Sequence, residues 1–205
     1  PAGELLGIVA PDPAAANALL ACLGREVDPS EGVVELDGVA VPALTIDEVR
    51  AAMLVAAHDA DLFEGSLISN VSSSTVDERV LVAAGADEVA HALPDGVRTE
   101  LTERARSLSG GQRQRVALAR ALAVDAPVLV LHDPTTAVDA VTEARIAEGL
   151  RELRAGRTTI LVTTSPALLA VADRVVVLAN GTIAAEGVHQ DLAATNADYR
   201  TAVLA

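Results

Sequence analysis

Short apolar runs rich in β-branched residues recur along the chain, with helix-like segments between them. The clearest are residues 128–131 (VLVL), 159–163 (TILVT) and 174–178 (RVVVL), and residues 4–10 (ELLGIVA) form a similar run. Strands that are apolar throughout are buried on both faces, which is typical of a parallel sheet covered by helices. The pattern therefore predicts an α/β fold built on a mostly parallel sheet.

Further elements and two turns accompany these strands. We expect a helix over residues 14–23, directly after the first strand. Residues 32–36 read as a strand that ends in an Asp-Gly pair at 37–38, which is a strong turn signal. An Asn-Gly pair at 180–181 predicts a second turn, which leads into a last strand over residues 182–185.

The middle of the chain differs from its two ends. Residues 86–93 and 112–122 have helical spacing, and strand signals are scarce around them. We therefore expect an α/β core made of residues 1–67 and 124–205, interrupted by a mostly helical insert over residues 68–123.

Composition argues against several classes of protein. Of the 205 residues, 51% are hydrophobic, which argues against disorder. The formal net charge is −14, so nucleic acid is not an expected partner. The single cysteine, Cys22, cannot form an internal disulfide and fits a reducing compartment. All 15 basic residues are arginine, so the chain offers no lysine to any site.

Residues 108–122 read LSGGQRQRVALARAL and carry the most specific motif of the chain. Ser109 is a good helix N-cap, and Gly110 and Gly111 let another molecule approach the backbone closely. A helix that starts here presents N–H groups and a partial positive charge, which suits a phosphate. Ser-Gly-Gly before a helix is a common cap when taken alone. The full string, with Gln112, resembles the signature motif of ABC ATPases.

The resemblance extends along nearly the whole chain. Residues 99–104 resemble the X-loop of ABC exporters, and residues 62–65 resemble the stretch after the exporter Q-loop. Residues 133–139 (DPTTAVD) are similar to the end of a Walker B strand and a D-loop, and residues 186–192 to the exporter C-terminal segment. The chain thus resembles the nucleotide-binding domain of an ABC exporter. This implies a P-loop NTPase-like (RecA-like) core with a helical signature subdomain.

The match begins just before the Walker A strand. The N-terminal strands of the family and its A-loop aromatic residue, which stacks on adenine, would therefore precede residue 1. The sequence opens abruptly with PAGELLGIVA, a few residues before the first strand. We expect the chain to be a fragment of a longer polypeptide.

The Walker A motif is vestigial. The family pattern is G-x-x-x-x-G-K-[ST], in which glycines expose N–H groups, the lysine reaches the phosphates and the hydroxyl holds Mg²⁺. Here Ala10 and Ala15 replace the glycines, Ala16 replaces the lysine and Asn17 replaces the Ser or Thr. The whole vestigial segment is Ala10, Pro11, Asp12, Pro13, Ala14, Ala15, Ala16, Asn17 and Ala18. The resemblance therefore implies weak or no ATP binding at this chain's own Walker site.

Two interpretations of this segment remain open. Asp12 suits an N-cap and Pro13 the first helical position. In one interpretation the Asp12 carboxylate substitutes for phosphate at the helix N-terminus and repels ATP. In the other, the segment is a plain strand-to-helix turn whose residues have drifted.

The other catalytic positions of the family are also altered. His132 stands where a carboxylate should hold Mg²⁺, and Asp133 where the catalytic Glu should orient water. His58 aligns with the Q-loop Gln and Thr164 with the switch His. Imidazole is a poor ligand for Mg²⁺, and no ligand spacing indicates another metal site. The resemblance implies an ATP-hydrolysing family, but this chain alone is expected to be inactive.

An intact signature beside a ruined Walker site implies one half of a two-domain device. In the family, each ATP lies between the Walker A of one domain and the signature of the other. Ser109, Gly110, Gly111 and Gln112 would therefore close over ATP and Mg held by an intact partner domain, with Asp139 reaching across nearby. We expect a heterodimer or a fused pair of unlike halves.

Residues between the motifs are expected to face a transmembrane domain. Phe63, Thr99, Glu100, Glu103 and Arg104 match loops that touch the membrane helices of exporters, which places the domain at the cytoplasmic face of the cell membrane. Alternatively, Phe63 is an ordinary core residue and residues 99–104 a solvated charged segment. Two rival functions remain open: a regulatory pseudo-ATPase, and a soluble ABC-type ATPase not engaged in transport.

Overall fold

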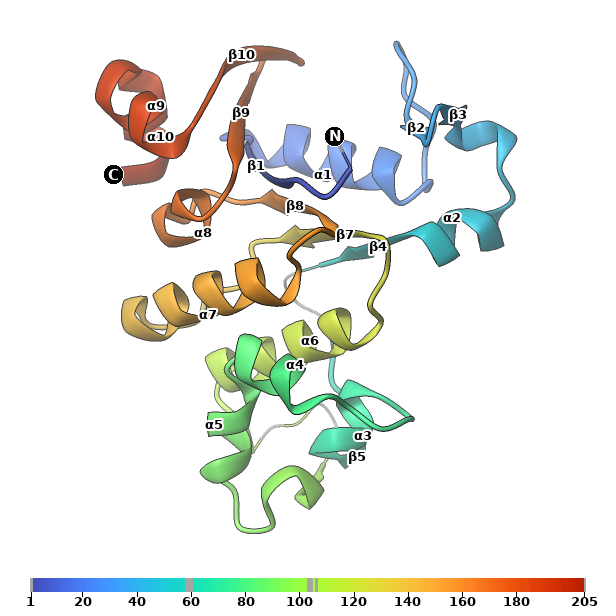
Figure 1. Cartoon of the computed structure of the whole chain (residues 1–205), viewed down its shortest axis with the longest axis vertical. Coiled ribbons are helices and arrows are strands. Elements are labelled where there is room, and N and C mark those ends of the chain that lie inside the picture. The colour runs from blue at the N-terminus through green and yellow to red at the C-terminus, as the bar shows by residue number, and fades with distance from the viewer. Residues whose placement is uncertain (1, 58–60, 103–104, 106, 205) are drawn as a thin grey trace.

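A six-stranded sheet forms the centre of the protein in the computed structural model, which describes residues 2–57, 61–102, 105 and 107–204. The strand order is β10-β9-β1-β8-β7-β4 (Figure 1). Neighbouring strands run parallel except β10, which pairs antiparallel with β9. The strands are β1 (Leu5–Val9), β4 (Met53–Ala56), β7 (Val128–His132), β8 (Thr158–Val162), β9 (Arg174–Ala179) and β10 (Thr182–Gly187). The predicted α/β fold with a mostly parallel sheet is confirmed.

Each face of this sheet carries its own apolar layer. Leu129, Leu131 and Leu161 belong to the cluster that includes the helical part of the chain. Val130 and Val162 belong to a second cluster with Ala16 of α1 (Pro13–Leu23). Successive side chains of a strand point to opposite faces, so consecutive apolar residues fill both layers. In Figure 1, α1 and α7 (Ala140–Leu153) accordingly lie on opposite sides of the sheet.

Two strands differ from the sequence expectation. The strand predicted over residues 32–36 is shorter: β2 (Glu35–Leu36) pairs antiparallel with β3 (Val39–Ala40) around the Asp-Gly turn. Strand β4 was not predicted. It follows α2 (Ile46–Ala52) with no turn signal between them, and it lies at the edge of the main sheet beside β7.

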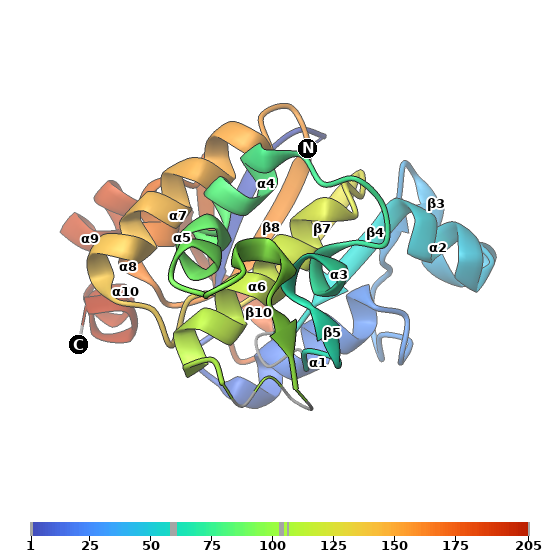
Figure 2. The same cartoon turned by 90° about the horizontal axis from the view of Figure 1, so that it is seen from below.

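Helices dominate the middle of the chain, as predicted (Figure 2). They are α3 (Leu67–Val71), α4 (Glu78–Ala83), α5 (Ala86–His91) and α6 (Gly110–Ala123). A short ladder of β5 (Gly65–Ser66) and β6 (Glu100–Leu101) joins the two ends of this part. The short 3-10 helices η1 (Val41–Ala43) and η2 (Gly96–Arg98) lie in the connections.

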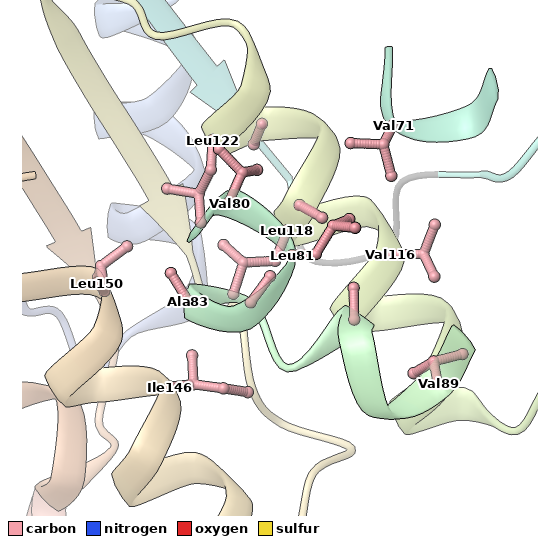
Figure 3. Packing of buried hydrophobic residues seen from close by; sticks show 14 of the residues in the cluster. Val71, Val80, Leu81, Ala83, Val89, Val116, Leu118, Leu122, Ile146 and Leu150 are labelled. Carbon is pink, nitrogen blue, oxygen red and sulfur yellow. The ribbon is translucent and has the colours of Figure 1, made fainter. Parts of the chain in front are cut away.

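The helical part packs tightly on the core. In Figure 3, side chains of α4, α6 and α7 meet in one apolar layer, with Ala83 of α4 beside Leu150 and Ile146 of α7. Gly149 lets α7 approach α4 closely, because a Cβ there would lie 2.9 Å from the Cα of Ala83. One apolar cluster therefore spans strands, α7 and the helical segment, and the division at residues 68 and 123 stays a prediction.

The C-terminal residues cover the sheet beside β9. Helices α8 (Pro166–Ala170), α9 (His189–Thr195) and α10 (Ala197–Leu204) pack there, and the fully buried Tyr199 belongs to one apolar cluster with Val9 and Val175. The Tyr199 hydroxyl is 2.7 Å from Nδ1 of His189. Among the helices of the described residues, none combines the length and apolarity needed to cross a membrane.

Candidate functional site

The carboxyl ends of three neighbouring strands bring the residues that were predicted to be altered catalytic positions to one edge of the sheet. Val162 of β8 pairs with Ile8 of β1 and with His132 of β7. The segment after β1, the Walker B end and Thr164 after β8 therefore lie at the same edge, where open α/β sheets bind ligands. Thr164 is exposed there. His58, the fourth altered position, lies outside the described residues.

The segment after β1 forms an ordinary capped helix start. The Asp12 side chain accepts a hydrogen bond from the Ala14 N–H (2.9 Å), and Pro13 is the first residue of α1. The backbone oxygen of Asp12 accepts from the Ala16 N–H at 3.1 Å. The predicted cap is confirmed, and the carboxylate of Asp12 stands at the helix end where a phosphate would bind.

Ala16, at the lysine position of the motif, is part of the core. It is only 4% exposed and packs in the apolar cluster that contains Ile8, Val49 and Met53. The other residues of the segment 10–18 lie mostly at the surface. Pro11, Asp12, Pro13, Ala14, Asn17 and Ala18 are exposed, and Ala10 and Ala15 are half-buried.

The end of β7 holds a histidine and a carboxylate side by side. Nε2 of His132 lies 3.6 Å from Oδ2 of Asp133. Asp133 has a φ of +43°, and its N–H donates to the Val162 carbonyl at 3.0 Å, so the chain turns sharply at this residue. Within the part of the chain that the structure describes, no three His, Cys, Asp or Glu side chains come together as a metal site.

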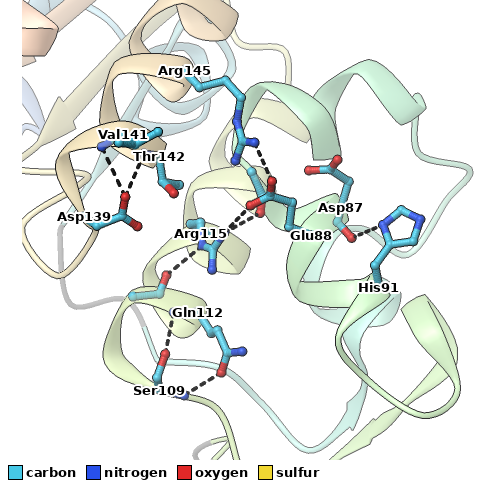
Figure 4. Close-up of polar contacts among 12 residues, drawn as sticks. Asp87, Glu88, His91, Ser109, Gln112, Arg115, Asp139, Val141, Thr142 and Arg145 are labelled. Carbon is cyan, nitrogen blue, oxygen red and sulfur yellow. Dashed lines mark hydrogen bonds and ion pairs between the residues drawn. The ribbon is translucent and has the colours of Figure 1, made fainter.

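The signature segment begins α6 with a complete capping box, drawn in Figure 4. Ser109 Oγ accepts from the Gln112 N–H (3.2 Å), and Gln112 Oε1 accepts from the Ser109 N–H (2.8 Å). The sequence signal was present, because Ser-x-x-Gln is the pattern of this box. The cap was predicted for Ser109, and the reciprocal role of Gln112 was missed.

Gly111 is required for close packing within the chain itself. A Cβ at this position would come within 3.0 Å of the Ala137 carbonyl oxygen, whereas a Cβ at Gly110 would meet only the Ala137 Cβ, at 3.6 Å. The glycines were predicted to admit another molecule. The structure adds that Gly111 lets the loop after β7 lie against the signature helix.

Gln114 holds the loop after β7 against the signature helix α6. This role was not predicted from the sequence. Its side chain is buried, with 7% of the residue exposed. Nε2 donates to the Asp133 carbonyl and to Thr136 Oγ1, both at 3.0 Å, and Oε1 accepts from the Ala137 N–H at 2.9 Å. A polar side chain four residues before the buried Leu118 was an available signal, because both lie on one face of the helix.

The segment that resembles a D-loop ends in another helix cap, at Asp139. Asp139 Oδ1 accepts from the N–H groups of Val141 (3.2 Å) and Thr142 (3.0 Å), as Figure 4 shows. The hydrogen bonds at Thr142 and Val141 hold the pKa of Asp139 below its ordinary value. Asp139 is exposed, and its expected reach toward a partner stays a prediction.

An ionic bridge joins three helices beside the signature. Arg115 Nη1 donates to Glu88 Oε2 at 3.2 Å and to the Gly85 carbonyl at 3.1 Å. The other oxygen of Glu88 accepts from Arg145 of α7 (Figure 4). Arg145 first, and then Arg115, lower the pKa of Glu88. The bridge ties α5 and α6 to the helix that Asp139 caps.

The segments expected to face a membrane domain are only partly described. Phe63 is 67% exposed, so the alternative of an ordinary core residue is wrong. Thr99 accepts from the Asp95 N–H through Oγ1 (3.1 Å) and from the Leu67 N–H through its carbonyl (3.0 Å). Glu100 is exposed on β6. The remaining two expected residues, Glu103 and Arg104, lie outside the described residues.

Known proteins are similar to this chain in sequence and in fold. Residues 1–136 match the ABC transporter family. An ATP-dependent lipid A-core flippase from Cupriavidus pinatubonensis is 37% identical over 208 residues, covering 97% of this chain and 35% of that protein. The uncharacterized ABC transporter ATP-binding protein YwjA from Bacillus subtilis is 36% identical, covering 93% of this chain and 34% of that protein.

A solved structure also resembles this chain in fold. A bacterial Atm1-family ABC exporter with ATP bound has a TM-score of 0.87 and 31% identity, covering 98% of this chain and 36% of that chain.

The sheet order and the likeness to this solved exporter structure define a P-loop NTPase-like domain with a helical segment. The chain belongs to the ABC transporter family. It spans about a third of the length of the relatives that it matches, 35% for the flippase.

Proposed function

We propose that this chain is the nucleotide-binding domain of a membrane exporter and that its two nucleotide-contacting surfaces differ in function. Its own Walker site does not hold MgATP productively. Its signature, Ser109, Gly110, Gly111 and Gln112, completes the ATP site of a different, intact partner domain. ATP and Mg are held mainly by that partner, and hydrolysis there is coupled to transmembrane export.

The observation that carries this proposal is the Asp12 cap. A phosphate at a helix N-terminus is bound by N–H groups and the helix dipole. Here the Asp12 carboxylate already accepts from the Ala14 N–H at 2.9 Å, and Pro13 has no N–H to offer. An approaching phosphate would meet a negative charge at the very place where the family binds one.

Two further features make the site unsuited to MgATP. The lysine position is Ala16, packed into the core, and the chain contains no lysine that could substitute for it. At the Walker B end, His132 offers imidazole where Mg²⁺ prefers oxygen ligands.

The signature surface, in contrast to the Walker segment, is suited to bind a phosphate. Ser109 and Gly110 are exposed at the start of α6, and the capping box holds the first turn in place. The remaining N–H groups of a first helical turn have no intrahelical partner and suit a phosphate of another molecule. The exporter relatives support a partner domain and a transmembrane domain as the two contacts of this chain.

These roles imply the assembly and its location. Two copies of this chain would contain two vestigial Walker sites, so the functional pair is a heterodimer or a fused chain with unlike halves. The domain would sit at the cytoplasmic face of the cell membrane, with Phe63, Thr99, Glu100, Glu103 and Arg104 toward the transmembrane domain. The net charge of −14 argues against nucleic acid as a partner.

Calorimetric titration of MgATP into the purified chain tests the vestigial site, with an intact nucleotide-binding domain as the control. We expect no heat of binding for this chain. Micromolar binding would overturn the proposal for residues 10–18. As a further prediction, Asp12→Gly raises any residual nucleotide affinity because it removes the competing carboxylate; an unchanged affinity would refute that role of Asp12.

A mixing experiment tests the signature. An exporter nucleotide-binding domain with complete Walker motifs is given a substituted signature, so that it cannot hydrolyse ATP by pairing with itself. Adding this chain should then restore phosphate release. Ser109→Ala should lower the restored rate, whereas Thr45→Ala, which removes the equivalent capping box of α2, should not. Failure of this chain to restore any turnover would refute the role in trans.

A further inference from the structure

Arg120, near the end of the signature helix α6, reaches a segment far away in the sequence. Its Nη1 donates to the Asp61 carbonyl at 2.9 Å. Its Nε donates to the Asn70 carbonyl at 2.6 Å, and its Nη2 to Asn70 Oδ1 at 3.0 Å. A planar guanidinium can make such a fixed set of bonds, which a flexible ammonium group cannot reproduce. The stretch around Phe63 is thus tied to α6 from both sides.

Asn70 completes this attachment. It is only 4% exposed, and its side chain binds both backbone groups of Phe63. Oδ1 accepts from the Phe63 N–H at 2.7 Å, while Nδ2 donates to the Phe63 carbonyl at 2.9 Å and to the Ser66 carbonyl at 3.1 Å. Both backbone polar groups of Phe63 are therefore bonded to one buried side chain.

The Phe63 ring, by contrast, lies at the surface. The guanidinium carbon of Arg120 is 5.0 Å from the centroid of that ring, within the range of a cation–π contact. One arginine therefore binds the carbonyls of Asp61 and Asn70, which precede and follow Phe63 in the chain, and also packs on the Phe63 ring. An aromatic side chain that is exposed but oriented by its neighbours is suited to transmit a movement.

We propose that Arg120 is a positioning residue that couples the signature motif to Phe63. Helix α6 is continuous from Gly110 to Ala123, so the signature and Arg120 are joined by about 15 Å of helix, at roughly 1.5 Å per residue. A displacement of the signature is carried along this helix and reaches Phe63 through Arg120 and Asn70. The inference rests on the proposed function, because it assumes that the signature moves when it closes over ATP.

Hydrogen exchange tests the attachment in the 205-residue chain itself. Arg120→Lys keeps the positive charge and loses the fork of donors. We expect the amide of Phe63 to exchange at least about tenfold faster in R120K, a loss of about 1.4 kcal/mol of protection, with amides of α6 and the central strands unchanged. Arg50→Lys, an exposed arginine on α2, is the matched control and should leave Phe63 unchanged. Unchanged exchange at Phe63 in R120K would overturn the inference.

Fluorescence tests the transmission. The chain has no tryptophan, so Phe63→Trp introduces a single probe at an exposed position. Emission is recorded when the partner domain of the mixing experiment, which has complete Walker motifs and a substituted signature, is added with MgATP. We expect a change in emission that is lost in F63W/R120K although the partner still binds. An equal change with and without R120K would refute the coupling role.

Hydrogen exchange and fluorescence together distinguish a failure of the proposed function from a failure of the coupling through Arg120. If the partner and MgATP do not bind at all, the proposed function fails, and hydrogen exchange alone decides whether Arg120 fixes Phe63. If the partner binds and R120K leaves the emission change intact, the proposed function stands and the coupling through Arg120 fails.

Discussion

Replacing Gly111 with alanine would place a methyl group against the backbone of the loop after β7. The added Cβ would come within 3.0 Å of the Ala137 carbonyl oxygen and would lie 3.3 Å from the carbonyl carbon. The obstacle is backbone, so it cannot move aside like the end of a flexible side chain. The Ala137 N–H is also held by Gln114 at 2.9 Å. Either the loop or the first turn of α6 must shift.

Gly110 provides the reference for the size of this effect. Alanine is favoured over glycine by up to about 1 kcal/mol inside a helix. Gly110 and Gly111 both lie in the first turn of α6, so any such gain is similar at the two positions. A Cβ at Gly110 makes one ordinary contact at 3.6 Å, so Gly110→Ala should be neutral or stabilising. Overpacking costs about 1–3 kcal/mol. Gly111→Ala should therefore be less stable than Gly110→Ala by roughly 1–3 kcal/mol.

Urea unfolding followed by far-ultraviolet circular dichroism measures this difference at 25 °C. For a chain of this size, 1 kcal/mol corresponds to about 2–4 °C in Tm, so calorimetry should separate the variants by roughly 2–12 °C. Equal stability of the two variants would refute the close approach of the signature helix to Ala137. In the mixing experiment, Gly111→Ala should also restore less phosphate release than Gly110→Ala per folded molecule.

Two further predictions concern packing and pH. Gly149→Ala should destabilise the chain by about 1–3 kcal/mol, because its Cβ would lie 2.9 Å from the Ala83 Cα; a neutral result in urea unfolding would contradict the close packing of α4 on α7. Burial raises the pKa of Tyr199 to about 12 from an ordinary 10.0, so the folded state holds this proton more tightly than the unfolded state. The resulting stability is complete below pH 10 and is lost as pH rises toward 12, by about 1.4 kcal/mol between pH 9 and 11. The chain has no lysine and one tyrosine, so Tyr199→Phe should abolish most of this alkaline slope; an unchanged slope would show that another group causes it.

Local chemistry explains why much of the fold could be predicted. β1 and α1 were predicted within a residue or two, because an apolar run and an Asp-Pro helix start are encoded by neighbouring residues. The start of α6 was predicted from its Ser cap in the same way. Strand β4 was missed because its pairing with β7 depends on residues more than seventy positions later, and MLVA alone carries little strand signal.

In the candidate site, too, features encoded by neighbouring residues could be predicted, and features that depend on distant contacts could not. The altered catalytic positions were predicted from the order of the motifs, and the parallel register of β1, β7 and β8 places the described ones at one edge of the sheet. The roles of Gln114 and Arg120 were not recognised. Each binds backbone atoms of a distant segment, and a sequence pattern does not show where those carbonyls lie.

The sequence by itself determined the α/β class and the resemblance to the ABC family, and it led to the prediction of a vestigial Walker segment beside an intact signature, because periodicity, caps and motif residues are properties of contiguous stretches. The tertiary structure decided that Ala16 is buried in the core, that Gly111 accommodates Ala137, and that the ring of Phe63 is exposed while its backbone is fixed. These features depend on contacts between segments far apart in the chain, which form only when the sheet and the helices pack together.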